Sequence, residues 1–173
     1  LERLARIMLD VTRIENNSLV LTKEIVDASE ILRDIVDSYN RKLEERNVER
    51  NNENTKMIII QNGIKNINAT IDKVRITQVI CNIFDNAISF SHEGKIRVIL
   101  KREKQNGQNF LIISVKDMGP GIDPEISSKL FTKFASKSDM GTGLGLFISK
   151  GIVEAHGGKI WAENNPYRGA KFS

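Results

Sequence analysis

The sequence has only one cysteine, Cys81, among its 173 residues. A single thiol excludes an internal disulfide and a cysteine-rich zinc site, so we expect a protein of a reducing compartment. No apolar run reaches the ~18 to 20 residues that span a bilayer, and the N-terminal stretch lacks the layout of a signal peptide. The chain is therefore expected to be cytoplasmic and to make no membrane contact of its own.

Aromatic residues are also scarce, at 6% of the chain, and no basic cluster has aromatics interleaved with it. Because stacking on bases needs such aromatics, we expect no nucleic-acid partner. The net charge of +4 is unevenly spread: residues 1–51 carry 9 Lys and Arg against 11 Asp and Glu, whereas the remainder has a net charge of +6. Anion binding is therefore expected in the second part of the chain.

Proline is absent from the first 119 residues, and nine of the twelve glycines lie from Gly119 onward, so regular elements come first and loops last. Leu1, Leu4, Met8 and Val11 follow an a/d-like spacing that predicts an amphipathic helix. We expect the helix that covers it to lie outside this chain, which begins at Leu1 and is taken for a fragment.

Helix-like and strand-like patterns alternate along the rest of the chain. Apolar residues at helical spacing from Ile25 to Tyr39 predict a second helix, and we place a domain boundary between residues 51 and 52. Extended segments are expected at 19–21, 56–60, 69–71, 95–102, 109–116, 159–163 and 170–173. Helices are expected at 73–89, at 144–155 and directly after Asp123, which would cap the short one.

The helix predicted at 73–89, with Asp72 as its N-cap, carries two asparagines one turn apart. Asn82 and Asn86 lie side by side at the edge of its apolar face, to which Phe90 is also assigned. Two carboxamides at i and i+4 can present oxygens to one ligand, and an amide oxygen suits Mg²⁺. The alternative is that both are edge residues that bond to solvent or to a neighbouring loop.

Asp117 ends an apolar row of alternating residues in the strand predicted at 109–116. A carboxylate in that position needs a hydrogen-bond partner. Either it caps the glycine turn that follows, or it accepts a hydrogen bond from an exocyclic amine such as that of adenine. Gly119 and Gly121 would let the backbone approach a flat ligand closely.

The glycine-rich run Gly141-Thr142-Gly143-Leu144-Gly145-Leu146 leads into the helix predicted at 144–155. Backbone N–H groups at a helix N-terminus form an anion site, and phosphate is its usual occupant. The run is neither a Walker A loop, because no Gly-Lys-Ser/Thr follows, nor a dinucleotide fingerprint, because no strand leads into it.

The order of these motifs resembles the catalytic domain of sensor histidine kinases, in the GHKL superfamily of ATP-binding folds. Asn82-x-x-x-Asn86-Ala87, Asp117-x-Gly119-x-Gly121, Leu130-Phe131-Thr132-Lys133-Phe134 and the run from Gly141 to Leu146 are similar to its N, G1, F and G2 boxes. Residues 9–15 look like the end of the second helix of the dimerisation and histidine-phosphotransfer domain. The resemblance covers nearly the whole chain.

This resemblance implies an α+β fold, a two-layer α/β sandwich preceded by a helical dimerisation segment, with ATP between the asparagine-bearing helix and a lid. Asn86 would ligate Mg²⁺, Asn82 would help at the phosphates, and Asp117 would bind the adenine amino group. The other implied contacts are Phe90, Gly119, Gly121 and Ile122 around the adenine, Lys133 in the lid, and Gly141, Thr142, Gly143, Leu144, Gly145 and Leu146 at the phosphates.

The lid region departs from the family pattern. Family members often have a lysine one residue before the aromatic of the N box, where this chain has Ser89. A phosphate-facing cation would then come from Lys133 or Lys137 in a short, mobile lid, which Phe131 and Phe134 would anchor.

Asn82 distinguishes between relatives, because members resembling gyrase and the heat-shock ATPases have what looks like a water-activating glutamate there. An amide cannot take a proton from water, so Asn82 favours transfer to a histidine. Neither histidine of this chain is expected to be the acceptor: His92 is predicted to be a solvated loop residue and His156 to end a helix, where the dipole stabilises it.

The sequence therefore predicts the ATP-binding catalytic part of a sensor histidine kinase, with the acceptor histidine on an upstream helix missing from this chain. By resemblance, the parent enzyme would be a homodimer, either soluble or the cytoplasmic part of a membrane sensor, that passes the γ-phosphoryl of Mg-ATP to histidine and then to a response regulator. The alternatives are a GHKL-type ATPase and a non-catalytic interaction module that binds no nucleotide.

Overall fold

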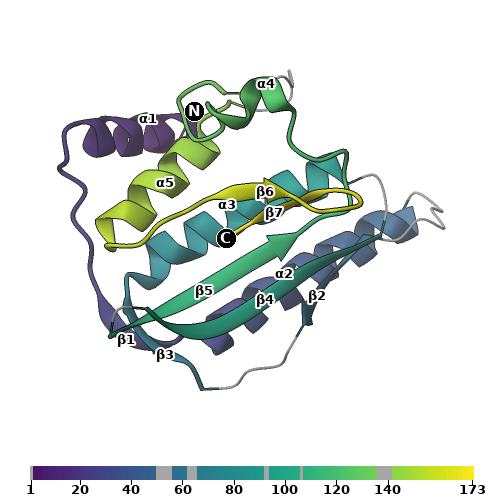
Figure 1. The fold of residues 1–173 in the computed structure, drawn as a ribbon, viewed down its shortest axis with the longest axis horizontal. Coiled ribbons are helices and arrows are strands. Elements are labelled where there is room, and N and C mark those ends of the chain that lie inside the picture. Colours follow the sequence, from purple (N-terminus) through teal and green to yellow (C-terminus); the bar gives the residue numbers. More distant parts are fainter. Residues whose placement is uncertain (1, 50–55, 62–65, 92–93, 106, 136–141) are drawn as a thin grey trace.

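The computed structural model describes residues 2–49, 56–61, 66–91, 94–105, 107–135 and 142–173 (Figure 1). Its helices are α1 (Glu2–Glu15), α2 (Ala28–Glu49), α3 (Lys73–Phe90), α4 (Pro124–Ser127) and α5 (Gly145–Ala155). Its strands are β1 (Glu24–Asp27), β2 (Lys56–Gln61), β3 (Asn68–Ile71), β4 (Gly94–Gln105), β5 (Gln108–Lys116), β6 (Ala162–Asn164) and β7 (Ala170–Phe172).

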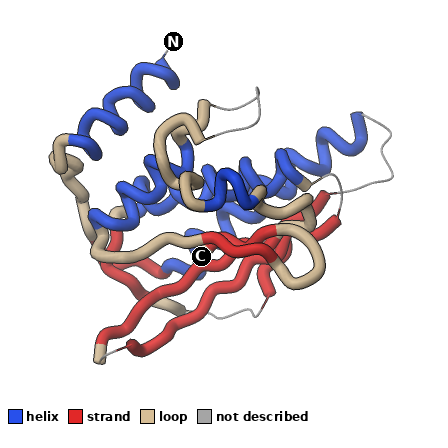
Figure 2. The backbone as a smooth tube through the Cα atoms, turned by 45° about the horizontal axis from the view of Figure 1, so that its top comes forward, coloured by secondary structure: helices blue, strands red, loops and turns tan. Residues whose placement is uncertain are grey.

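The elements form two layers. Five strands make one sheet in the order β2-β4-β5-β7-β6, and α2, α3 and α5 lie on one side of it (Figure 2). The β2–β4 pair is parallel and the other pairs of this sheet are antiparallel. The core lies between the layers, where Phe84, Ile96, Val98 and Ile152 are each 0% exposed. The predicted two-layer α/β sandwich is thus confirmed.

Local sequence signals account for most element ends. The Asp72 carboxylate accepts a hydrogen bond from the Arg75 backbone N–H at 3.0 Å, which satisfies a free donor at the start of α3. Asp123 does the same for α4 by accepting from the Glu125 N–H at 2.8 Å. The hairpin of β4 and β5 is also formed, in a register that pairs Gln105 with Gln108.

Four expectations about the elements were wrong. The helix predicted from Ile25 starts only at Ala28, because residues 24–27 form β1 and pair with β3, an alternative that helical spacing cannot reveal. No strand forms at 19–21, and β6 begins at Ala162 rather than at 159. Phe90 does not belong to the buried face of α3, since it is 50% exposed.

The expected domain boundary, between residues 51 and 52, lies outside the described residues and stays a prediction. Elements on both of its sides share one core, which contains Leu32 of α2 and Ile58 of β2. The Asn40 side chain of α2 also bonds to both backbone groups of Ile58, at 2.9 Å to its N–H and 2.8 Å to its carbonyl. These contacts tie α2 to β2 of the sheet.

Helix α1 packs on the edge of the helical layer. The buried Asp10 carboxylate accepts hydrogen bonds from Arg75 at 2.8 Å and Gln78 at 2.9 Å, both on α3. A Cβ at Gly151 of α5 would lie 2.6 Å from the Ile14 side chain, so any larger residue there would displace Ile14. The second half of α1 therefore finds its partner within the chain, contrary to expectation, whereas Leu4 and Met8 are 53% and 45% exposed.

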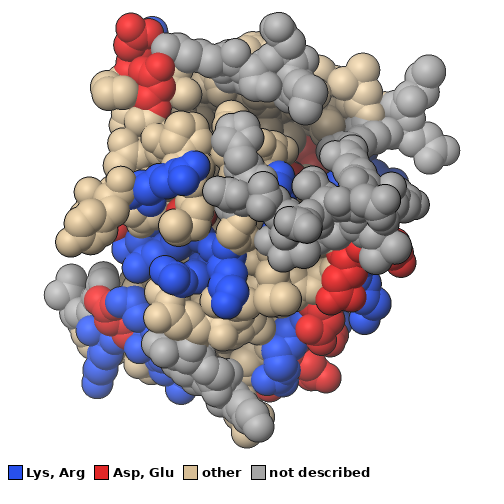
Figure 3. All heavy atoms as spheres, turned by 90° about the vertical axis from the view of Figure 1, so that its right-hand side faces the viewer, with Lys and Arg blue, Asp and Glu red and all other residues tan. Residues whose placement is uncertain are grey.

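The opposite side of the sheet has no described helix over it (Figure 1). Figure 3 shows Lys and Arg side chains near the middle of this view and others, next to acidic side chains, toward its lower edges. None of the described helices has both the length and the apolar character needed to cross a membrane.

Candidate functional site

Helix α3 carries the two asparagines of the first motif, and they differ in their contacts. The Asn82 amide donates to the Gly145 carbonyl at 3.1 Å and to the Ser149 hydroxyl at 3.3 Å, which ties α3 to the start of α5. The half-buried Asn86 carboxamide forms no hydrogen bond with any residue that the structure describes. Asn86 is thus the one of the two whose oxygen is available to a ligand.

The first backbone N–H groups of α5 have no capping side chain. No side chain caps it at Leu144, and its first turn contains no acidic residue. The first N–H groups of a helix lack partners within the helix, so they can bind an anion here. Gly143 precedes them with a φ of +64°, and a Cβ there would lie 2.7 Å from the Phe134 backbone. Gly141, predicted in the same run, lies outside the described residues.

Asp117 follows β5 and is 5% exposed. Its Oδ1 accepts from the backbone N–H groups of Gly119 at 2.8 Å and Ala170 at 3.1 Å. Its Oδ2 forms no hydrogen bond with the described part of the chain. Both sequence interpretations are therefore compatible with the contacts: one oxygen caps the turn, and the other is left for a donor.

The two glycines after Asp117 are required by the protein itself. A Cβ at Gly119 would lie 2.8 Å from the Phe90 carbonyl oxygen, where α3 ends. At Gly121, with a φ of +88°, a Cβ would lie 2.8 Å from the Asn164 side chain. The sequence suggested close approach of a ligand, whereas the structure gives packing against α3 and β6 as the reason for glycine.

The hairpin between β6 and β7 supports this loop, and sequence reasoning missed it. Asn164 accepts from the Ile122 N–H at 2.6 Å and donates to the Ile122 carbonyl at 3.0 Å. Asn165 donates to the Asp117 carbonyl at 3.3 Å. Gly169 adopts a φ of +83°, and a Cβ there would lie only 2.1 Å from that same carbonyl oxygen. The Asn-Asn pair before a proline was the available signal, because such residues favour turns.

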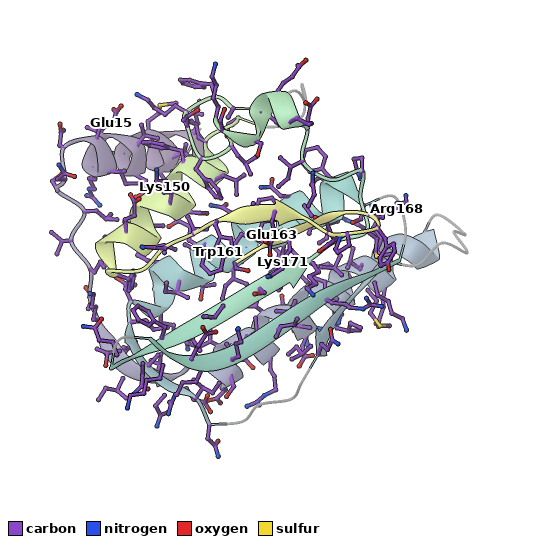
Figure 4. The ribbon with its side chains drawn as sticks, viewed as in Figure 1. Glu15, Lys150, Trp161, Glu163, Arg168 and Lys171 are labelled. Carbon is purple, nitrogen blue, oxygen red and sulfur yellow. The ribbon has the colours of Figure 1, made fainter. Side chains whose placement is uncertain are left out.

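Three other predicted contacts lie around these motifs. Phe90 is half-exposed at the end of α3, and the Ile122 side chain packs against the core. The Lys133 ammonium pairs with the Glu15 carboxylate on α1, which Figure 4 labels. Of the two lid phenylalanines, Phe131 packs against the core, whereas the Phe134 side chain is 68% exposed and its backbone N–H donates to the Gly143 carbonyl at 3.0 Å. Lys137 lies outside them.

The remaining reactive side chains have structural roles. His156 accepts the Asp72 N–H at 3.0 Å through Nε2, and its Nδ1 lies 2.8 Å from the Ile152 carbonyl. Both ring nitrogens are therefore engaged, and His92 lies outside the described residues. Burial raises the pKa of the half-buried Cys81 thiol, so it stays protonated. The described residues contain no cluster of three or more His, Cys, Asp or Glu fit for a metal.

The site is organised along α3. Its Asn82 contacts the uncapped start of α5, and its C-terminal Phe90 packs against the loop of Asp117 and Gly119. Eight residues of helix separate these two contacts, or about 12 Å along the axis. The arrangement offers anion donors at one end, a free carboxamide between, and a carboxylate acceptor at the other end.

Comparisons with known proteins agree on one group. The profile of the family described as histidine kinase-, DNA gyrase B-, and HSP90-like ATPase matches residues 71–173. The sensor protein kinase WalK of Staphylococcus saprophyticus is 33% identical over 168 residues, which is 94% of this chain and 26% of that protein. The sensor protein FixL of Bradyrhizobium diazoefficiens is 37% identical over 101 residues, 58% of this chain and 20% of that protein.

Solved structures show the same likeness. The histidine kinase AdeS of Acinetobacter baumannii superposes with a TM-score of 0.76 at 26% identity, covering 99% of this chain and 75% of that one. The nucleotide-free catalytic domain of the histidine kinase ThkA gives a TM-score of 0.73 at 28% identity, covering 88% and 93%. The chain spans about a fifth to a quarter of the curated relatives, at 20% of FixL and 26% of WalK.

Proposed function

This chain belongs to the family of histidine kinase-, DNA gyrase B- and HSP90-like ATPases, and on that premise we propose how it binds ATP and what its parent protein does with it. The chain is the ATP-binding catalytic part of a sensor histidine kinase. The parent protein would transfer the γ-phosphoryl group of ATP to a histidine outside this chain. From there the group would pass to a response regulator.

We place the adenine at Asp117. The observation that carries this assignment is a carboxylate that is 5% exposed and has one oxygen, Oδ2, without a partner among the described residues. No buried side-chain oxygen of the described residues lacks a partner, so Oδ2 is accessible from outside the protein, and the exocyclic amine of adenine is a donor that could bind it. The half-exposed Phe90 and the loop of Gly119, Gly121 and Ile122 would surround the base.

The phosphates would lie at the start of α5. The backbone N–H groups of the first turn of α5, from Gly145 onward, would donate to them, together with the rest of the run from Gly141 to Leu146. The Asn86 carboxamide, free of partners among the described residues, fits Mg²⁺, which would neutralise phosphate charge. Asn82 would hold α5 in place for this contact through its bonds to Gly145 and Ser149.

The residues around the phosphates favour transfer to histidine over hydrolysis. Asn82 is an amide and cannot act as a base toward water, whereas an acceptor imidazole is already a nucleophile. Lys133 is the candidate lid cation, and it would have to leave Glu15 of α1 to reach a phosphate. Catalysis by this chain would then rest on positioning and on charge neutralisation.

Calorimetric titration with a non-hydrolysable ATP analogue, with and without Mg²⁺, tests the proposal. We expect binding that Mg²⁺ strengthens, and negligible phosphate release when the chain is incubated with ATP. Absence of binding would indicate a non-catalytic interaction module. Steady phosphate release would indicate an ATPase.

Asn86→Ala is expected to remove the part of the binding that depends on Mg²⁺, because the carboxamide oxygen would be lost as a ligand. In the same titration, affinity with Mg²⁺ should fall to about the value measured without it. The control is Asn109→Ala, because Asn109 is an exposed asparagine near the start of β5. This variant should keep the full response to Mg²⁺. An unchanged response in Asn86→Ala would refute its role.

Asn164→Ala is expected to weaken ATP binding by about 2- to 12-fold, the worth of one ordinary hydrogen bond, because the loop at Ile122 loses its support. Binding of inorganic tripolyphosphate should not change, since the start of α5 is untouched. Asn164→Asp keeps an acceptor for the Ile122 N–H, so its ATP affinity should lie between that of the unchanged chain and that of Asn164→Ala. Equal losses for ATP and tripolyphosphate would show a general effect on the fold instead.

The wider context follows from the relatives and from the substrate. We propose that the parent protein is a homodimer that works with a response regulator in the cytoplasm, where ATP is available. We further propose that the ATP-binding unit begins near β1, since β1 pairs with β3 and α2 shares the core of the sheet. We expect neither nucleic acid nor membrane at the ATP site.

A further inference from the structure

The open side of the sheet carries a straight row of cations. Arg97 of β4 lies opposite Lys116 of β5, and Lys116 lies opposite Lys171 of β7. Directly opposite residues of antiparallel strands point to the same side of a sheet, so these three side chains stand next to one another. We call Arg97, Lys116 and Lys171 the cationic row. Figure 4 shows Lys171 beside Glu163, its neighbour on β6.

The row is only partly neutralised within the protein. Like charges directly opposite each other destabilise a sheet. Lys171 donates to the Glu163 carboxylate at 2.7 Å, and this bond, with the charges of Lys171 and Lys116, holds the pKa of Glu163 below its usual value. Among the described residues, Arg97 and Lys116 form no ion pair. Lys95, two residues before Arg97 and exposed, adds a further positive charge on the same side.

An uncharged row runs alongside. Ile99 lies opposite Ser114, whose hydroxyl is 2.8 Å from that of Ser173. Ser173 exchanges two backbone hydrogen bonds of 2.9 Å with Trp161, which is 42% exposed. Ser114 is buried, so Trp161 is the exposed large side chain of this row, and arginine and tryptophan are both enriched in protein–protein interfaces.

We propose that this side of the sheet binds an acidic helix of a partner protein, with three successive carboxylates against the cationic row. Neighbouring strands lie about 4.8 Å apart, so Arg97 and Lys171 are about 10 Å apart across the sheet. Residues i and i+7 of a helix lie about 10.5 Å apart along its axis, with i+3 or i+4 between them on the same face. The spacing of the carboxylates therefore matches the spacing of the cations, and the helix would cross the strands.

Charge and shape disfavour the other anionic partners. Trp161 is the only exposed aromatic of the two rows, which is too few for stacking on a nucleic acid. Ile99 is half-buried, so among the residues of the two rows Trp161 is the one that could insert into a lipid surface. Both a nucleic acid and a lipid surface would bring negatively charged phosphates against Glu163, next to Lys171. A helix can instead place an uncharged or basic residue opposite Glu163.

The test is fluorescence titration of this chain with a labelled helical peptide of about 20 residues that has glutamates at i, i+3, i+4 and i+7 on one face. Lys116→Glu should weaken binding at least about tenfold, because it reverses the charge at the centre of the row. Arg97→Glu is the second variant, in case Lys116→Glu alters the fold. Glu163→Gln should strengthen binding, because it releases Lys171.

The control is Lys101→Glu, which makes the same charge change on the same strand but outside the row, and it should bind the peptide like the unchanged chain. Equal binding of a peptide that has the same composition but scattered glutamates would overturn the proposal. Failure to bind, or tighter binding to phosphatidylglycerol vesicles or to oligothymidylate, would overturn it as well. None of these outcomes depends on whether the chain binds ATP.

Discussion

Asp117→Asn is expected to weaken ATP binding by about 5- to 150-fold, which corresponds to the loss of one buried hydrogen bond of about 1 to 3 kcal/mol. In the folded chain, Oδ1 accepts from the N–H groups of Gly119 and Ala170, so the asparagine must keep its oxygen there. Its NH₂ group then replaces Oδ2 and faces the adenine amine. Two donors meet, and the acceptor that would recognise adenine is lost.

The measurement is the titration with the non-hydrolysable ATP analogue, accompanied by a melting curve to show that the variant is folded. Asp123→Asn is a matched control, because it makes the same chemical change at the N-cap of α4, and asparagine caps a helix as well as aspartate does. It should bind ATP normally. If Asp117→Asn also binds ATP normally, the adenine does not lie at this carboxylate.

Gly169→Ala is expected to lower the free energy of unfolding by about 2 to 5 kcal/mol. The left-handed backbone, with a φ of +83°, costs about 1 to 2 kcal/mol for a residue with a Cβ. The new Cβ would also lie 2.1 Å from the Asp117 carbonyl oxygen, and such overpacking costs about 1 to 3 kcal/mol more. Because that contact displaces Asp117, ATP binding should weaken in the folded fraction too.

Gly157→Ala separates these two contributions. Gly157 has nearly the same φ, +82°, but nothing lies within 4 Å of a Cβ placed there. Urea unfolding should therefore show a loss of only about 1 to 2 kcal/mol, with ATP binding intact. Equal losses of unfolding free energy in Gly169→Ala and Gly157→Ala would mean that a Cβ at residue 169 does not clash with Asp117.

Helices and strands could be predicted where residues close together in the chain determine them. The start of α3 was predictable because Asp72 caps a helix through residues only three positions away. The strand β1 was not predictable, because it exists through pairing with β3, more than forty positions along the chain. Ile25 and Ala28 have helical spacing, but the backbone bonds to β3 decide the conformation of residues 24–27.

The candidate site shows the same division. Asn82, Asn86, Asp117 and the glycine-rich run are recognisable from residue type and spacing alone. Residue type and spacing do not distinguish the tasks of Asn82 and Asn86, and only the resemblance to the family assigned Mg²⁺ to Asn86. Only the position of α5 makes Asn82 a link to Gly145 and leaves Asn86 without a partner among the described residues.

The sequence by itself determined the family, the order of the motifs and most element boundaries, since these depend on residues close together in the chain. The tertiary structure explains why Gly119, Gly121 and Gly169 must be glycine. It also determines that Asn164 supports the loop after Asp117 and that cations align across β4, β5 and β7. These are contacts between segments far apart in the chain. Strand register and helix packing set them, and neither can be obtained from local propensity.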